Sequence, residues 1–507
     1  MKKLSLALLL AICLLIPQNI QAASPISYAN QINVAVLSSS STTLKTEGAY
    51  QVLNNDTKST TLIPSGTTLS IKKASNGINI SFTGYNQTSQ SGFHVQEITG
   101  VEQLTVFNSA TTMHSGASTS YPVSHTFQAG SSAFYLDSFT NVAGENWYNV
   151  SVGSLKGWVP AKNVTLKKPS ALSLATLSNG TKYRGSFQFK VSGSQVQVIN
   201  YLDMENYLKG VVPSEMPASW HKEALKAQAI AARSFAANSM LLSNSAASQV
   251  YRGYSGEDSR TNAAIEETAG LLVKYNGKPI QTFFHSTSGG RTANVGDVWN
   301  SNQTNFPYLV SVDDPYETSP YSNWQETFTP AAILKSFGFT NTSATIYDIT
   351  YKKSGANGEV TSVTVKTSAG DKTITGNESV IRKAFPLQSS SHYNQLYSNW
   401  FDIELVGGQM AFQVQTVSGT SNLSDVKGVK VQTASGQVIL PDSKVSIQTA
   451  NGIVTNEGTG VSSIVVKGKG WGHRIGMSQY GAKGLAEKGW KAEQIITHYF
   501  KGTTVSK

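Results

Sequence analysis

The sequence predicts an α+β protein, in which a β-rich main domain contains one central buried helix and is interrupted by a small β-barrel. Short apolar segments separated by Ser, Thr, Asn and Gly fill most of the 507 residues, a pattern typical of short strands and turns. One long apolar repeat at helical spacing, near the middle of the chain, indicates the buried helix. Closely spaced aromatic strand segments between about 98 and 168 indicate the barrel.

The first 23 residues have the pattern of a secretory signal peptide. Met1, Lys2 and Lys3 give a basic start, residues 4–16 form a short apolar run, and residues 20–23 offer small side chains for cleavage. The run is too short for a comfortable transmembrane span. We therefore expect a secreted protein of the cell wall or of the outer face of the membrane.

Charge and cysteine content narrow the classes of partner and chemistry. Lys and Arg number 40 against 30 Asp and Glu, so the formal charge is +10, and loss of Lys2 and Lys3 leaves +8. For an exported chain this charge favours wall teichoic polymers or anionic lipid headgroups over nucleic acid; the alternative is a surface charged for solubility. The only cysteine, Cys13, lies in the apolar run after Ile12, which argues against a lipoprotein anchor. A mature chain without thiols has no disulfide framework, cysteine-ligated metal or cysteine nucleophile.

Three further segments follow the signal peptide. Residues 24–97 are the first β part, with strands expected at 32–37 and 69–72. Residues 98–168 form the inserted barrel, in which Trp147 and Trp158 either line an aromatic groove or fill the core. Residues 169–507 form the main part, which opens with strands at 187–191 and 196–199.

Glu215 is the candidate for catalysis. It lies between Pro213 and Pro217, each of which fixes its own φ and disfavours helix in the residue before it. We therefore expect Glu215 on a stiff, non-helical elbow that presents its carboxylate; the alternative is a carboxylate that caps a helix. Upstream, Asp203 is a good N-cap and Glu205 suits the helix dipole, so Glu205 is interpreted as structural.

The central helix is expected to follow this elbow, from Ser219 as N-cap to about Met240. Lys226, Ile230 and Arg233 recur on one helical face, so two cations are placed about two turns apart. They either line a cleft beside Glu215 or face solvent.

A hairpin is expected at 271–284 around Asn276 and Gly277, and it leads into the segment from His285 to Arg291. The glycines of this segment suit a tight loop with exposed backbone N–H groups. His285 is a proton carrier, a hydrogen-bond donor to sugar or a loop histidine with internal partners. No His, Asp or Cys near it has metal-ligand spacing, so we expect no metal.

Residues 330–460 are expected to be a β scaffold, with strands such as 359–366 and 426–432 and a short helix capped by Asn377. The glycine-rich segment 468–486 then provides a loop that approaches a ligand closely, and the helix expected from Met477 to Lys488 directs its N-terminus at that loop. The Walker pattern is absent, which argues against a nucleotide site. His473 and Gln479 either contact a sugar or hold the loop.

Three of these motifs together resemble a known family. They read E-N-Y-L-K-G-V-V-P-S-E-M-P from Glu205 with A-L-K-A-Q-A-I-A-A-R to Arg233, H-S-T-S-G-G at His285, and G-K-G-W-G-H-R-I-G-M-S-Q-Y-G-A at 468–482. They resemble the stage II sporulation protein D and LytB amidase-enhancer family of bacterial cell walls, and the insert resembles a bacterial SH3-like domain. Arg474 stands where the family usually has glycine, so a different loop shape and an added cation are expected.

The resemblance implies a peptidoglycan lytic transglycosylase that acts between MurNAc and GlcNAc. Glu215 would be its single acid/base, with substrate contacts from Lys226, Arg233, His285, Ser288, His473 and Gln479, and no cofactor. The rival reading is a noncatalytic wall-binding protein that stimulates an N-acetylmuramoyl-L-alanine amidase. The family's SH3-like domains use aromatic grooves to hold wall peptides, which would give the insert a wall-binding role.

Overall fold

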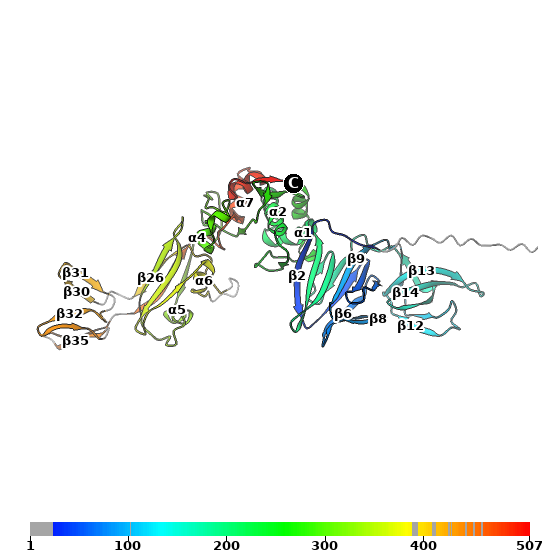
Figure 1. The fold of residues 1–507 in the computed structure, drawn as a ribbon, viewed down its shortest axis with the longest axis horizontal. Coiled ribbons are helices and arrows are strands. Elements are labelled where there is room, and N and C mark those ends of the chain that lie inside the picture. The colour runs from blue at the N-terminus through cyan, green and yellow to red at the C-terminus, as the bar shows by residue number, and fades with distance from the viewer. Residues whose placement is uncertain are drawn as a thin grey trace, which may run out of the picture. The chain divides into compact units, whose positions relative to one another are not determined.

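The computed structural model describes residues 24–101, 103–387, 394–407, 412–423, 426, 428–441, 444–449, 452–457 and 460–507. The chain forms two compact units (Figure 1). The first takes in residues up to Val211 together with Met240–Glu257, and the second contains Val212–Ser239 and Asp258–Lys507. The expected signal peptide lies outside the described residues, and none of the described helices is long and apolar enough to cross a membrane.

The first unit is built on two β-sheets that face each other, since β19 contacts β7 and β20 contacts β6. One sheet has the order β21 (Leu242–Ser243), β2 (Gln31–Ser39), β20 (Gln195–Asp203), β19 (Ser186–Ser192), β9 (Phe93–Thr99), β4 (Tyr50–Asn54) and β5 (Thr60–Ile63), with β1 (Ser24–Pro25) also on β9. The other has the order β18 (Lys182–Tyr183), β17 (Leu174–Leu177), β3 (Ser41–Glu47), β6 (Thr68–Ala74), β7 (Gly77–Phe82) and β8 (Tyr85–Ser89). The four strands predicted at 32–37, 69–72, 187–191 and 196–199 are confirmed.

The insert forms an antiparallel sheet in the same unit. Its order is β12 (Val123–Phe127), β11 (Thr111–His114), β15 (Leu155–Pro160), β14 (Asn146–Val152), β13 (Ser132–Thr140), β10 (Leu104–Phe107) and β16 (Val164–Lys167), with a 3-10 turn at Ala161–Asn163. The pairings between these strands leave β12 and β16 as edges, so the closed barrel expected from the sequence is not formed by them. Trp147 is buried, whereas Trp158 is half-buried and meets Phe139 edge to face, with ring centroids 5.9 Å apart.

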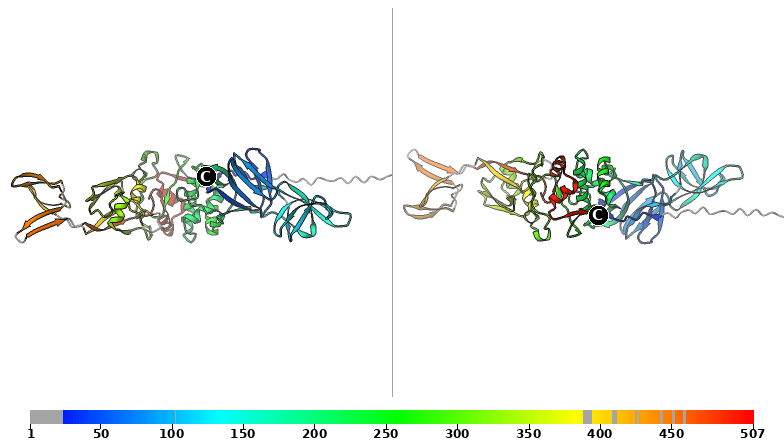
Figure 2. Two further views of the ribbon diagram at one scale, coloured as in Figure 1. Left: turned by 90° about the horizontal axis from the view of Figure 1, so that it is seen from below. Right: turned by 90° about the horizontal axis from the view of Figure 1, so that it is seen from above.

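The helical core of the second unit surrounds α2 (Lys222–Ala237), which is almost fully buried. It contacts α3 (Ser259–Glu267), α7 (Gln479–Glu487) and α8 (Ala492–Tyr499), so the C-terminal segment, red in Figure 2, lies against the green α2. The small sheet β23 (Lys278–Pro279), β22 (Leu272–Tyr275) and β38 (Thr504–Ser506) completes this core. Asn276 and Gly277 have positive φ between β22 and β23, which confirms the predicted hairpin at its turn. Its second arm is shorter than the expected run to residue 284, because β23 ends at Pro279.

A second core of this unit lies between two three-stranded sheets. One has the order β25 (Trp324–Phe328), β36 (Val461–Gly468) and β29 (Phe401–Gly407), and the other β26 (Ile346–Ser354), β27 (Glu359–Thr367) and β28 (Lys372–Thr375). Helices α5 (Pro330–Ser336) and α6 (Glu378–Lys383) border it, and Asn377 caps α6 as predicted. Three hairpins follow: β30 (Phe412–Thr416) with β31 (Gly419–Leu423), β32 (Lys430–Thr433) with β33 (Gly436–Ile439), and β34 (Lys444–Thr449) with β35 (Gly452–Glu457). The strand expected at 359–366 is confirmed as β27. Of that expected at 426–432, only 430–432 is strand, and residue 427 lies outside the described residues.

Candidate functional site

Glu215 is the last residue of α1 (Met204–Glu215), which begins in the first unit and ends in the second. The prediction of a non-helical elbow from Pro213 is wrong, because the helix continues through Pro213. A proline this close to the end removes only one late backbone hydrogen bond, and the amide of Met216 still donates to the Val212 carbonyl at 2.9 Å. The helix ends just before Pro217, which disfavours helix in the residue ahead of it. Glu215 therefore projects from the C-terminal end of a helix and is half-buried.

Gln479 brings the C-terminal motif to Glu215. Its Nε2 donates to Glu215 Oε2 at 3.4 Å. Gln479 is the first residue of α7, and Ser478 caps this helix by accepting a hydrogen bond from the Gly481 amide at 3.1 Å. The expected helix from Met477 to Lys488 thus begins two residues later. Two motifs separated by 264 residues meet at one carboxylate.

The loop that starts at His285 joins the same C-terminal segment through β24 (Phe284–His285). This strand pairs in parallel with β37 (Met477–Ser478), and isolated bridges link Thr287 to Trp471 and Ala293 to Ile475. Gly289 has a φ of +78°, and a Cβ there would lie 2.8 Å from the Gly470 backbone nitrogen, so the two glycine-rich segments approach too closely for a side chain. The His285 motif and the glycine-rich C-terminal motif therefore pack directly against each other.

The backbone N–H groups of this loop are occupied, contrary to expectation. The amides of Ser288 and Gly289 donate to the Glu317 carboxylate, and the Gly290 amide donates to Ser288 Oγ. Ser478 Oγ donates to the same Glu317 at 2.7 Å. Glu317 therefore ties the loop to the N-terminal end of α7, where Gln479 contacts Glu215.

Asp314 provides a second carboxyl group behind this loop, and unlike Glu317 it is buried. It accepts hydrogen bonds at 2.9 Å from Ser288 Oγ and from Tyr499 Oη. Burial, with a further contribution from the charge of Glu317, raises the pKa of Asp314 to about 7. The sequence analysis missed both carboxylates. The acidic run at 313–317 was the only signal, and nothing in its spacing distinguishes a buried acid from a solvated one.

His285 and His473 lie together, with ring centroids 5.6 Å apart. His285 is buried, and its Nδ1 lies 3.1 Å from the Ile475 carbonyl, so this nitrogen carries the proton and Nε2 is unprotonated. Burial lowers the pKa of His285 well below its usual value and the pKa of His473 to about 4. Both rings are therefore neutral near pH 7. Of the three alternatives for His285, a loop histidine with an internal partner describes this contact; a role in binding sugar stays a prediction for both residues.

Arg474 does not add a free cation to the loop. It keeps a left-handed backbone, with a φ of +63°, so the conformation typical of glycine is retained here. Its guanidinium donates at 2.9 Å to the carbonyls of Ser288 and Arg291 and pairs with Glu359 at 3.3 Å. Burial lowers the pKa of Arg474 to about 10, which still leaves it charged at neutral pH. Arg474 holds the loop from within.

The cations predicted on α2 do not line a cleft together. The helix begins at Lys222 with His221 as its N-cap, and not at Ser219. Arg233 is 2% exposed and donates to the carbonyls of Leu271 and Ile265, so its expected placement on an accessible face is wrong. Helical spacing fixes that two residues share a face but not whether that face is covered. Lys226 is partly exposed and pairs with Glu223 at 3.1 Å and Glu267 at 3.7 Å; its contact with substrate stays a prediction.

An aromatic pair that the sequence analysis did not select flanks Gln479. Trp220 and Tyr480 are half-buried with ring centroids 4.8 Å apart, and Lys483 Nζ lies 5.6 Å from the Trp220 ring centroid. Amphipathic rings of this kind are suited to a sugar ring, which has apolar faces and polar edges. Among the described residues, no group of three or more His, Asp, Glu or Cys side chains is arranged to hold a metal ion.

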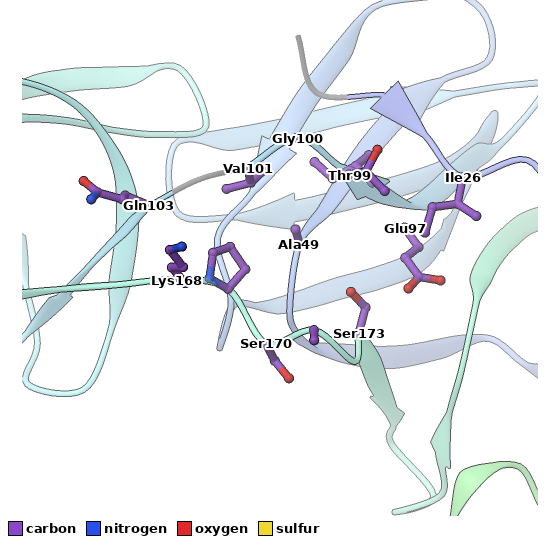
Figure 3. A pocket seen from close by; sticks show the side chains of 13 residues that line it. Ile26, Ala49, Glu97, Thr99, Gly100, Val101, Gln103, Lys168, Ser170 and Ser173 are labelled. Carbon is purple, nitrogen blue, oxygen red and sulfur yellow. The ribbon is translucent and has the colours of Figure 1, made fainter. Parts of the chain in front are cut away.

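One cavity elsewhere contains a perturbed carboxyl group but none of the predicted site residues. It lies in the first unit, has a volume of about 580 Å³, and is lined by Glu97, Lys168 and Ser173, among others (Figure 3). Burial raises the pKa of Glu97, which accepts a hydrogen bond from Tyr28 Oη at 3.1 Å. Glu97 also lies in β9, where it is paired with Tyr50 of β4.

Comparison with known proteins supports the motif analysis. A family model described as "Stage II sporulation protein" matches residues 192–275. The amidase enhancer of Bacillus subtilis (strain 168) is 32% identical over 302 residues, which cover 59% of this chain and 40% of that protein. Stage II sporulation protein D is 28% identical over 336 residues in Bacillus subtilis (strain 168) and 26% identical over 337 residues in Bacillus amyloliquefaciens; both alignments cover 61% of this chain and 76% of the relative. This chain thus spans well under half of the amidase enhancer.

Proposed function

The resemblance to stage II sporulation protein D and the amidase enhancers is confirmed, and from it we propose that this chain is an exported cell-wall protein that cleaves peptidoglycan glycan strands. One observation carries the proposal: Gln479, from the C-terminal motif, contacts Glu215, from the first motif, at 3.4 Å. A polar neighbour on a half-buried carboxylate is suited to orient an acid/base group. The aromatic pair Trp220 and Tyr480, whose members lie close in sequence to Glu215 and Gln479 respectively, offers a surface for a sugar ring.

The proposed reaction is a nonhydrolytic cleavage between MurNAc and GlcNAc. Ordinary glycosidases use two carboxylates, because the second serves as nucleophile or activates water. In a lytic transglycosylase the C6 hydroxyl of MurNAc attacks its own C1, so one carboxylate is enough. Glu215 would protonate the leaving O4 of GlcNAc as the C1–O bond breaks. It would then accept the proton of the C6 hydroxyl as the 1,6-anhydro ring closes.

The neutral histidines and the carboxyl groups of Asp314 and Glu317 fit this proposal, because they support the site. Asp314 and Glu317 hold the His285 loop against the N-terminus of α7, and Arg474 holds the same loop from the opposite segment. None of these groups is then required to exchange a proton with sugar. A sugar contact from Ser288 would have to compete with its hydrogen bond to Asp314.

Mass spectrometry of fragments released from purified sacculi by the pure protein tests this function. We expect muropeptides that end in 1,6-anhydro-MurNAc. Fragments with a free reducing end would instead identify a hydrolase. Glycan strands stripped of their peptides should be tested in parallel, because stem peptides can block access to the bond.

The second candidate is a noncatalytic protein that stimulates a cell-wall amidase. The relative named amidase enhancer favours it, at 32% identity. An enhancer would need the same glycan-binding residues but no proton transfer at Glu215. The relatives named for sporulation suggest a role in that process for either candidate.

We further propose that the insert is an SH3-like module that binds the wall. Trp147 is 1% exposed and fills the core, whereas Trp158 is half-buried beside Phe139, which is 52% exposed. Of the two tryptophans, only Trp158 is therefore available to a ligand, together with the exposed Phe139. The net charge of the chain would add attraction to teichoic polymers at low salt.

A further inference from the structure

The sheet β25-β36-β29 of the second unit has one face in the second core and one face exposed. Trp324, Gly468 and Phe401 lie in one cross-strand row, and the two aromatic side chains of that row are buried in the core. The next row consists of Gln325, Lys467 and Asp402. Because successive side chains alternate between the faces of a sheet, this second row faces outward. All three of its residues are exposed.

A shallow groove runs over this outward face. It has a volume of about 550 Å³, within the usual range of ligand sites. Besides Trp324, Phe401 and Gly468 of the buried row, it is lined by one aromatic, two amide and three charged residues: Trp400, Asn323, Gln325, Asp402, Lys467 and Lys469. We call it the Trp400 groove.

The groove has the composition of a sugar site. Trp400 is half-buried, rests on the Arg474 guanidinium at 4.2 Å from its ring centroid, and has Lys469 Nζ 5.1 Å from that centroid. Asn323 and Gln325 are exposed, and their amides form no side-chain hydrogen bond to any residue that the structure describes. Lys467 pairs with Glu404 and Asp402 with Lys353, but such exposed pairs contribute little and exchange readily for a ligand.

We propose that the Trp400 groove is a second binding site for the glycan strand, separate from the residues around Glu215. The apolar face of a sugar ring stacks on an indole, and its hydroxyl and acetamido groups bond to amides and carboxylates. The lysines suit the carboxylates that a peptidoglycan strand carries. A phosphate polymer has no ring that would stack on the indole, and the Asp402 carboxylate would repel it. A protein partner would need a broader apolar surface. The proposal deepens the proposed function and rests on it for the identity of the polymer.

One segment connects the groove with the candidate site. Strand β36 leaves the groove at Lys467–Lys469 and continues through the loop that ends at Gln479, which contacts Glu215. Arg474, in that loop, touches Trp400 and also holds the carbonyls of Ser288 and Arg291. A glycan strand bound at both places would be held at two points along this segment.

Calorimetric titration of the full-length chain tests the groove. The probes are peptide-free glycan strands, the N-acetylglucosamine tetramer and, as a phosphate polyanion, polyglycerol phosphate. Every variant is made in a Glu215→Gln background so that no bond is cleaved. Trp400→Ala should weaken glycan binding by about three- to tenfold, the usual contribution of one aromatic contact. Asn323→Ala with Gln325→Ala should also weaken binding and leave the fold intact, because both residues are exposed. Thr327→Ala, on the same exposed face of β25 beyond the groove, is the matched control and should change nothing.

The outcomes separate this proposal from the proposed function. If the amide double variant binds as tightly as the control, and Trp400→Ala does too where it folds, the groove is not a glycan site. If these variants weaken binding of polyglycerol phosphate and leave glycan binding unchanged, the groove binds polyanions and the proposal is equally wrong. A loss of glycan affinity in a chain whose wild type releases no anhydro products would uphold the groove and overturn the cleavage activity instead.

Discussion

Arg474 forms a fully buried ion pair with Glu359, in which the guanidinium and carboxylate lie 3.3 Å apart and neither side chain reaches solvent. The Glu359 carboxylate also accepts a hydrogen bond at 2.8 Å from the Asn357 side chain. A buried charge that loses its partner is costly, because neither water nor another charge replaces it. The pair therefore fixes the conformation of the loop that presents His473 on one side and Gln479 on the other.

The first prediction concerns this pair. Glu359→Ala and Arg474→Gly should each lower the stability of the second unit by about 3–5 kcal/mol, since each strands a buried charge. The double variant should lose less stability than the sum of the two single losses, because it leaves no buried charge without a partner. Thermal or denaturant unfolding of the four proteins in a double-mutant cycle measures the coupling. Strictly additive losses would show that the two charges do not depend on each other.

The second prediction concerns Asp314, whose pKa of about 7 lies above the ordinary aspartate pKa of 3.8. Between these values the folded state holds a proton that the unfolded state releases, so stability falls as pH rises. The slope approaches about 1.4 kcal/mol per pH unit at most. Asp314→Asn should remove this pH dependence. The unfolding free energy of wild type should therefore fall relative to that of Asp314→Asn as the pH rises from 4.5 to 7. A constant difference over this range would place the titration elsewhere.

The third prediction reverses what helical spacing alone suggested for Arg233. Because its guanidinium is buried against backbone carbonyls, Arg233→Ala should cost about 3 kcal/mol of stability. Arg260→Ala is the matched control: Arg260 lies on the neighbouring α3, pairs with Asp258 and is 60% exposed. Its loss should leave the unfolding midpoint nearly unchanged, because an exposed ion pair contributes little to stability. Equal effects on the unfolding midpoint would contradict a structural role for Arg233.

The fourth prediction concerns the insert. Trp158→Ala should reduce co-sedimentation with purified sacculi and leave the unfolding midpoint nearly unchanged, whereas Trp147→Ala should destabilise the insert, since Trp147 fills its core. Val142→Ala, at a fully exposed position of the same insert, is the neutral control. Deletion of about 98–168 should weaken sedimentation further and preserve cleavage of soluble glycan. If the Trp158 variant and the deletion both sediment like wild type, the insert does not hold the wall.

Sequence patterns predicted best the features that depend on a few adjacent residues. The hairpin at Asn276 and Gly277 follows from positive φ, and the cap at Asn377 from a side chain that reaches its own helix. The contact between Glu215 and Gln479 joins residues far apart, and only the resemblance of both motifs to one family suggested that they act together. No local pattern reveals it.

The errors share a physical cause, since burial depends on what the rest of the chain supplies. The helical spacing of Arg233 is compatible with an exposed cation. The side chain is buried because α3 and the segment around Leu271 lie over it. Asp314 and Glu317 read as a solvated acidic turn, yet their partners, including Ser288, Ser478 and Tyr499, come from distant segments. Pro213 does not break the helix, because only two residues of the helix follow it.

The last prediction decides between an enzyme and an enhancer. Glu215→Gln keeps the size of the side chain and much of its hydrogen bonding but cannot donate and regain a proton. The variant should bind glycan and lose about 10²–10⁴-fold in rate, enough to abolish a detectable ladder of anhydro-muropeptides. Gln479→Ala removes only the neighbour at 3.4 Å, so it should lower the rate by less and retain the same products.

Three results of this last experiment have distinct meanings. Equal anhydro products from wild type and Glu215→Gln would overturn the catalytic role of Glu215. If wild type releases no product from intact or peptide-stripped strands but accelerates an added amidase, the chain is an enhancer. In that case Glu215→Gln should still stimulate the amidase, because an enhancer needs the shape and polarity of the site and not its proton. Loss of stimulation in the folded variant would instead show that the enhancer needs the Glu215 carboxylate itself for binding.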